Sequence, residues 1–330
     1  MSLKNIGEFG LIAEIRDAFK AGMPDLDRPY ENKSSEALKG IGDDCAVLSQ
    51  HDGMVTLVST DMLVEGDHFL LDDISPYQLG WKSAAVNISD IAAMGGRPTA
   101  TFLALALPAK LGNAWMKEFI RGYRDISVRF SCPLLGGDTT SSPDGLSICV
   151  TVLGQCRKGA ERCRDMAHEG DLVCVTGCLG DSAAGLRIIL DNKLRDTDAV
   201  QLIEKHYLPM PRVEEGLKLA ATPGVHAMMD ISDGIGSDLR HILKASRKGA
   251  EIDVMSLPLS GELNRVCARE GWDPVELATC GGEDYELLFT ITPEAEAKLD
   301  VEHHIIGRIT SGERIKWIGS DRDYLGFRHF

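Results

Sequence analysis

The chain has 330 residues, enough for one large or two medium domains, and its formal net charge of −15 argues against a nucleic-acid-binding protein, which needs a basic face. No apolar run approaches the roughly 18 residues that cross a bilayer. The N-terminus carries no signal pattern, so we expect a cytoplasmic protein without membrane contact.

The nine cysteines include no C-x-x-C pair, which argues against a zinc ribbon or a redox pair. Several lie in apolar runs, such as Cys149 and Cys174. This placement and the odd number favour reduced, buried thiols.

The first half of the chain alternates predicted helices and strands. An amphipathic helix is predicted over 7–20, followed by a loop over 21–42 that is rich in Pro, Asp, Asn and Ser. The elements predicted next are a strand at 55–60, a helix at 76–94 closed by two glycines, a strand at 99–107, a helix at 113–129 and a strand at 146–153.

A polar, charged stretch over 157–171 is the best candidate for a domain boundary. The alternation of strands and helices predicts an α/β or α+β protein with two domains, 1–157 and 158–330. The elements predicted in the second domain are a strand at 172–176, helices at 182–190 and 232–246, and strands at 250–254 and 284–291.

Six short segments place aspartate, glutamate or glycine next to an apolar run. Carboxylates at the ends of elements lie on a rigid scaffold, where several can converge. Any one of them is more often a turn residue, but a real cluster implies bound cations, because clustered carboxylates raise each other's pKa. Oxygen ligands of this kind suit Mg²⁺. The segments are 40–44, 59–61, 87–90, 136–139, 230–234 and 281–285.

Asn87 and Asp90 share one face of the predicted helix at 76–94, among apolar neighbours. A carboxylate there needs a partner, so the alternatives are an interior hydrogen bond, a helix cap or a metal ion. Gly136 and Gly137 permit close backbone approach to a phosphate, although a Gly-Gly pair alone usually marks a turn. The Walker, protein-kinase and common hydrolase motifs are missing from the sequence.

Seven ordered motifs resemble those of the thiamine-monophosphate kinase family. The resemblance covers nearly the whole chain and extends to a superfamily with aminoimidazole ribonucleotide synthetase, selenophosphate synthetase and a hydrogenase-maturation protein. It implies two domains of the aminoimidazole ribonucleotide synthetase type, each a mixed sheet packed with helices, and a homodimer formed through the N-terminal sheets. The motifs lie at 40–47, 59–69, 84–95, 135–140, 175–185, 230–234 and 281–287.

The resemblance also implies roles for individual residues. ATP would be contacted by Gly137 with Asp138, by Tyr123, Arg164 and Ser232, while Asp233 would hold a further Mg²⁺ near the transferred phosphate, so that Asp233 and Arg164 are the catalytic candidates. Thiamine monophosphate would lie against His68, Glu283 and Phe327. For Tyr123 and Phe327, a packed aromatic is the competing interpretation. The implied Mg²⁺ ligands around the ATP phosphates are Asp44, Ser59, Thr60, Asp61, Asp90, Asp138 and Asp230.

The implied reaction is the last step of thiamine diphosphate biosynthesis. A phosphate oxygen of thiamine monophosphate would attack the γ-phosphorus of ATP in line, while Mg²⁺ ions and Arg164 neutralise the charge. The nucleophile is already an anion, so no strong general base is needed. Two alternatives stay open: a nucleotide-binding regulator without catalysis, disfavoured by His68 and Glu283, and a Mg²⁺-dependent phosphohydrolase with water as acceptor.

Overall fold

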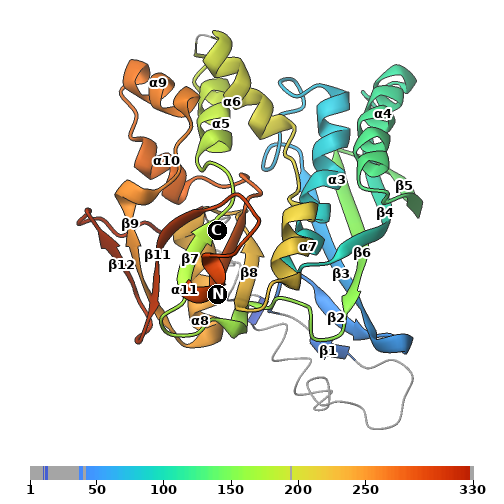
Figure 1. Ribbon diagram of the computed structural model, residues 1–330. Helices are drawn as coiled ribbons and strands as arrows, with labels where there is room; N and C mark the ends of the chain where they lie inside the picture. The colour runs from blue at the N-terminus through green and yellow to red at the C-terminus, as the bar shows by residue number, and fades with distance from the viewer. Residues whose placement is uncertain (1–9, 11, 14–36, 40–41, 194, 328–330) are drawn as a thin grey trace.

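The computed structural model describes residues 42–193 and 195–327, together with 10, 12–13 and 37–39. The helix predicted over 7–20 and the loop predicted over 21–42 lie almost wholly outside these residues. Two six-stranded sheets, one from each half of the chain, organise the rest (Figure 1). In the part of the chain just defined, no helix has the length and apolar character needed to cross a membrane.

The first sheet has the strand order β1–β2–β3–β6–β4–β5. Neighbouring strands are antiparallel except for the parallel pair β4–β5. Helices α3 and α4 lie against it, as Figure 1 shows. The bounds are β1 (Ala37–Lys39), β2 (Ala46–Ser49), β3 (Met54–Val64), α3 (Pro76–Ala93), β4 (Arg97–Pro108), α4 (Asn113–Arg129), β5 (Leu134–Ser142) and β6 (Ser147–Arg157).

Helix α3 is the central element of the molecule. Ser75 and Gln78 form a capping box at its start, where Pro76 occupies the first turn. The helix is buried on nearly all sides, because it contacts β3, β4, β6 and α4 of the first half and α6, α7 and β8 of the second. Gly80 allows its close approach to α4, since a Cβ there would lie 1.9 Å from the Phe119 carbonyl oxygen.

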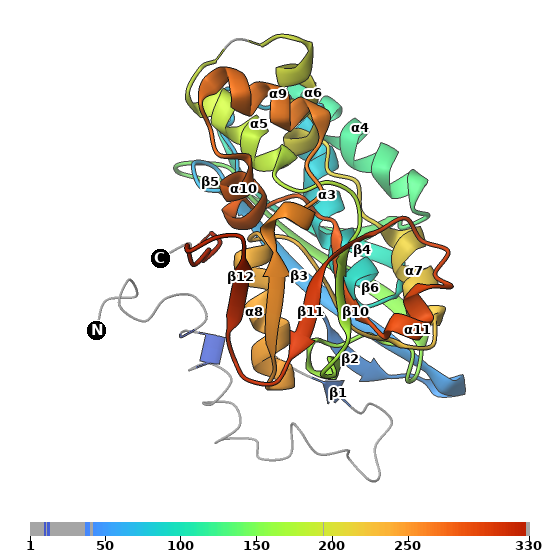
Figure 2. The same ribbon diagram turned by 60° about the vertical axis from the view of Figure 1, so that its left-hand side comes forward.

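The second sheet has the order β12–β9–β11–β7–β10–β8, antiparallel except for the parallel pair β12–β9. Figure 2 shows the β12, β11 and β10 part of this sheet, with α8 behind it. The bounds are β7 (Leu172–Val175), α5 (Asp181–Leu190), α6 (Thr197–Tyr207), α7 (Val213–Ala221), β8 (Val225–Asp230), α8 (Ile235–Ser246), β9 (Gly249–Asp253), α9 (Gly261–Glu270), α10 (Pro274–Cys280), β10 (Leu287–Ile291), α11 (Pro293–Glu296), β11 (His304–Thr310) and β12 (Ile315–Ile318).

Each of the ten elements predicted between residues 55 and 291 has a counterpart of the same type in the structure, so the predicted fold class is confirmed. Several elements were not predicted, among them β5 and β8. Strand β5 contains Gly136 and Gly137, a pair that we interpreted as a possible phosphate contact or a turn, and it lacks the apolar alternation of a half-buried strand. Strand β8 is short. It ends at Asp230, the first residue of the segment 230–234, which we interpreted as a candidate metal-binding segment and not as the end of a strand.

Candidate functional site

Three predicted carboxylates converge where the two sheets meet. Asp44 precedes β2, Asp90 lies on α3 and Asp230 ends β8. One carboxylate oxygen from each lies within 4.8 Å of the other two. Because these residues come from both halves of the chain, the site exists only when both sheets are folded and packed together.

Strand β3 adds a fourth carboxylate to this group. Side chains alternate along the strand, so Ser59 and Asp61 face α3 while Thr60 points to the opposite face of the sheet. The Ser59 hydroxyl donates a hydrogen bond of 2.6 Å to Asp90. The Thr60 hydroxyl contacts Thr151 on the other face, so within this chain only its backbone carbonyl could bind an ion beside Asp90.

Helix α3 also holds the carboxylates of its neighbours in place. The Asn87 side-chain oxygen accepts a hydrogen bond of 3.2 Å from the backbone N–H of Asp61, and Ser89 donates one of 2.5 Å to Asp230. For the Asp90 carboxylate, the hydrogen bond from Ser59 is the interior partner that was one of its predicted alternatives. The sequence patterns did not single out Ser89, although it directly precedes Asp90 in the motif at 84–95.

The electrostatics of the site call for a cation. Burial, with the nearby charge of Asp44, raises the pKa of Asp61 to about 6 and that of Asp230 to about 7. Burial, with the charge of Asp61, also raises the pKa of Asp90 well above its usual range. The four carboxylates and the Ser59 hydroxyl offer only hard oxygen donors, and this donor set fits Mg²⁺.

Arg164 supplies one positive charge to the cluster. Its guanidinium lies 2.5 Å from Asp44, and Ser246 donates a hydrogen bond of 2.8 Å to its backbone carbonyl. Burial opposes its charge, but the attraction of Asp44 holds the pKa of Arg164 above its ordinary value. One guanidinium does not neutralise four carboxylates, so the cluster keeps negative charge that bound cations can balance.

The structure does not bring Asp138, Gly137 and Tyr123 to the cluster. Cross-strand partners join Asp138 to Ala104, Ala104 to Cys149 and Cys149 to Met62. Asp138 thus lies three strands from β3, roughly 14 Å away, and faces the same side of the sheet as Met62, opposite α3. Tyr123 is only 3% exposed and packs beside Phe119 in the interior, as its competing interpretation expected.

The two late motifs run side by side near Asp230. The Ser232 carbonyl accepts a hydrogen bond of 2.8 Å from the Glu283 N–H, and the Asp233 carbonyl accepts one of 2.9 Å from the Phe327 N–H. Phe327 is about half exposed beside this turn. Glu283 adopts a positive φ of 64°, which is costly for a residue with a side chain and is concentrated at functional sites.

Two residues that the sequence analysis missed surround Glu283. Lys82 of α3 is fully buried, and its Nζ lies 2.7 Å from Glu283 Oε1, at an angle poor for a hydrogen bond. His206 Nδ1 lies 3.2 Å from Oε2. Burial would raise the pKa of Glu283, but Lys82, His206 and His68 together hold it below its usual value. His68 is thus close enough to Glu283 to influence its pKa, and a shared role in acceptor binding stays a prediction.

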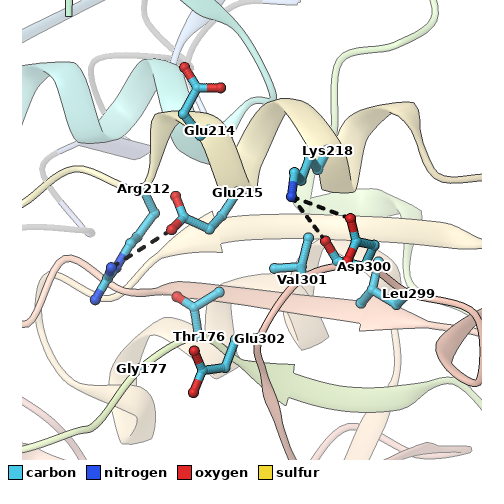
Figure 3. Close-up of a pocket in the computed structure, with 10 residues that line it drawn as sticks. All are labelled: Thr176, Gly177, Arg212, Glu214, Glu215, Lys218, Leu299, Asp300, Val301 and Glu302. Atoms are coloured by element: carbon cyan, nitrogen blue, oxygen red, sulfur yellow. Dashed lines mark hydrogen bonds and ion pairs between the residues drawn. The ribbon is translucent and has the colours of Figure 1, made fainter.

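A pocket beside α7 does not coincide with this chemistry. Figure 3 shows a pocket of about 530 Å³ beside α7, in which Arg212 pairs with Glu215 and Lys218 with Asp300. None of the predicted site residues lines it. Its two cations, Arg212 and Lys218, already have carboxylate partners, whereas the carboxylates at the junction of the two sheets carry excess charge, so we place the function there.

The fold and the carboxylate cluster define the class of the protein. The family model for the N-terminal domain of AIR synthase related proteins matches residues 42–156, and the model for their C-terminal domain matches residues 168–319. The two matched regions contain the two sheets, with the exception of β1 and the last residue of β6.

Relatives with known names narrow this class. A thiamine-monophosphate kinase of Escherichia coli strain K12 is 41% identical over 89% of this chain and 86% of its own length. One from Aquifex aeolicus strain VF5 is 36% identical over the full length of both. A solved structure of AaThiL complexed with AMPPCP and TMP has a TM-score of 0.88 at 35% identity, covering 100% of this chain and 99% of that one. The chain belongs to the thiamine-monophosphate kinase family.

Proposed function

We propose that this chain is an ATP-dependent kinase that phosphorylates thiamine monophosphate to thiamine diphosphate. The observation that carries the proposal is the convergence of Asp44, Asp90 and Asp230 beside an ion-paired Glu283. The activity in the names of its relatives and the AMPPCP and TMP bound to AaThiL support it. The nine cysteines are free thiols, which supports a reducing, cytoplasmic location.

The residues of this chain position two anions for direct transfer. Asp44, Asp61, Asp90 and Asp230 would hold Mg²⁺, which when bound neutralises phosphate charge and orients the triphosphate. Arg164 adds a fixed positive charge at Asp44, and Ser232 and Asp233 border the same region. His68, Glu283 and Phe327 would hold the acceptor so that its phosphate points at the γ-phosphorus. The acceptor is already ionised, so no residue has to remove a proton.

Consumption of ATP should require both Mg²⁺ and thiamine monophosphate, because the acceptor phosphate is the nucleophile and the carboxylates need cations before a triphosphate can approach. The measurement is ADP release with each component omitted in turn, together with detection of thiamine diphosphate. Comparable ADP release without thiamine monophosphate would support the phosphohydrolase alternative. ATP binding without turnover under any of these conditions would support the non-catalytic regulator.

We further propose that two chains form a homodimer through their N-terminal sheets and that each site takes Asp138 from the second chain. Residues 134–141 of β5 are all exposed, which is unusual for a sheet strand, and Leu135 and Met62 are 64% and 56% exposed. Strand β2 pairs with β3 only up to Val58, and no other strand of the described residues pairs with this edge of β3 beside Thr60. A symmetric partner on this face could reach that edge.

Mixing two inactive variants tests the shared site. Asp61→Asn and Asp138→Asn should each be inactive, but their co-expressed mixture should regain about a quarter of wild-type turnover, because half of randomly paired dimers contain one intact composite site. Differently tagged chains allow the mixed dimer to be isolated and its mass measured. A mixed dimer without activity would show that Asp138 acts within its own chain, and wild-type turnover of Asp138→Asn alone would show that Asp138 takes no part.

A further inference from the structure

A second group of ligating side chains lies at the other end of β8. His168 and Asp171 belong to the segment between β6 and β7, and His226 is the second residue of β8. Asp230 ends the same strand four residues later, so this group lies roughly 13 Å from the carboxylate cluster. None of its three members takes part in the proposed phosphoryl transfer.

The three side chains point the atoms that bind metals at one another. His168 Nδ1 lies 3.0 Å from His226 Nδ1, and His226 Nδ1 lies 2.8 Å from Asp171 Oδ2. All three atoms are within 4.8 Å of one another. Asp171 is only 3% exposed, His226 is partly buried and His168 is exposed. The group is therefore anchored in the protein at Asp171 and open to solvent at His168.

Hydrogen bonds alone satisfy the two imidazole nitrogens and the carboxylate oxygen poorly. Between two Nδ1 atoms and a carboxylate oxygen, one proton on His226 Nδ1 has to serve both neighbours, and a second proton on His168 would face it. A cation at the centre would accept a lone pair from all three atoms. Ligands around a tetrahedral Zn²⁺, at about 2.0–2.2 Å from the ion, lie roughly 3.3 Å apart, so a small outward movement of the rings would suffice.

We propose that His168, Asp171 and His226 form a binding site for a transition-metal dication such as Zn²⁺, distinct from the Mg²⁺ site. Two imidazoles and one carboxylate suit Zn²⁺ and its neighbours, whereas Mg²⁺ prefers oxygen ligands alone. The exposed side near His168 leaves a position for water. The backbone N–H of His168 already donates to Asp171 Oδ2 at 2.8 Å, which holds the turn in place without metal.

A bound ion would tie the segment between the sheets to β8. This segment also carries Arg164, four residues before His168, and β8 ends at Asp230. The site therefore fastens two chain segments that both contribute to the carboxylate cluster. This site is independent of the proposed kinase activity, because its ligand atoms and their distances are the same whatever reaction the chain catalyses.

Co²⁺ is the probe for the test, because two nitrogens and one oxygen give tetrahedral Co²⁺ an intense visible absorption, unlike an all-oxygen octahedral site. The full-length protein is titrated with Co²⁺ in excess Mg²⁺, which occupies the carboxylate cluster. We expect one equivalent to bind with that absorption and without a thiolate charge-transfer band. Zn²⁺ should displace it and raise the melting temperature.

His226→Gln and His168→Gln should each weaken Co²⁺ binding at least about tenfold, as expected for loss of a ligand. His168 is exposed, so its variant should fold even if the His226 variant does not. His304→Gln removes an exposed histidine of β11 outside the group and should bind Co²⁺ like the wild type. Equal Co²⁺ affinity in the wild type and His168→Gln would overturn the proposal, as would equal losses in all three variants.

Discussion

Replacement of Asp90 by asparagine is expected to lower kinase turnover by about a hundredfold or more, since loss of a metal ligand removes several kcal/mol of transition-state stabilisation. Asp90 is partly buried, accepts a hydrogen bond from Ser59 and lies within 4.8 Å of Asp44 and Asp230. The amide keeps the shape and the hydrogen-bond acceptor but removes the charge. Steady-state turnover at several Mg²⁺ concentrations measures the effect.

The same substitution should leave the metal-free protein at least as stable as the wild type. The raised pKa values of Asp61 and Asp230 mean that the folded chain binds protons that the unfolded chain releases. Metal-free stability therefore falls as pH rises from about 4 to about 7. With one charge removed, that fall should be smaller, which melting curves in a chelator across this pH range will show.

Asp181→Asn is the matched control for Asp90→Asn. Asp181 is buried, begins α5 and accepts a hydrogen bond of 2.6 Å from Ser260, but it does not belong to the carboxylate cluster. We expect its turnover to stay near that of the wild type. Near-wild-type turnover of Asp90→Asn at moderate Mg²⁺ would show that Asp90 is not a ligand.

Lys82→Met should destabilise the protein by about 3–5 kcal/mol, nearer the lower value because the Glu283 side chain is 25% exposed. The substitution leaves Glu283 without its cation. His206 is neutral in the wild type, because burial and Lys82 lower its pKa to about 3, and burial, the larger cause, still opposes its charge in the variant. Denaturant unfolding measures the loss. A matched exposed pair, Lys110 with Glu65, should cost about 0–1 kcal/mol when Lys110 becomes methionine.

Glu283→Gln alone does not test acceptor binding cleanly, because it leaves Lys82 charged and fully buried. The double variant Lys82→Met with Glu283→Gln should recover most of the lost stability, which a double-mutant cycle will reveal. In that background we expect weaker binding of thiamine monophosphate and unchanged binding of ATP by calorimetry, and the same for Phe327→Ala. Equal losses for both ligands would mean that these residues support the fold rather than the acceptor site.

Much of the fold was predictable because strong periodic patterns coincide with the real elements. Helix α3 is bounded by Pro76 and a pair of glycines, and β6 follows the alternation of a half-buried strand. Strand β5 was missed because its exposed, glycine-containing sequence has no such alternation. What decides its conformation is pairing with β4, a contact between distant segments that local patterns do not reveal.

The candidate site was predictable in its carboxylates but not in their surroundings. The motifs singled out Asp44, Asp90 and Asp230, and the structure brings them together. Lys82 was overlooked, because a lysine on an apolar helix reads as a surface residue until its burial is known. The position of Asp138 also depended on the sheet order, which the sequence does not state.

Helix α3 carries Asp90, which belongs to the carboxylate cluster, and Lys82, which pairs with Glu283, eight residues apart on one buried element. At 1.5 Å per residue these anchors are separated by about 12 Å along the axis. Under the proposed function, the helix sets the distance between the residues at the phosphate end and those at the ring end of the acceptor. A single inserted residue between them would change the length by about 1.5 Å and rotate one anchor by about 100°. Selection for substrate length therefore falls on a segment that need not touch the substrate along most of its course.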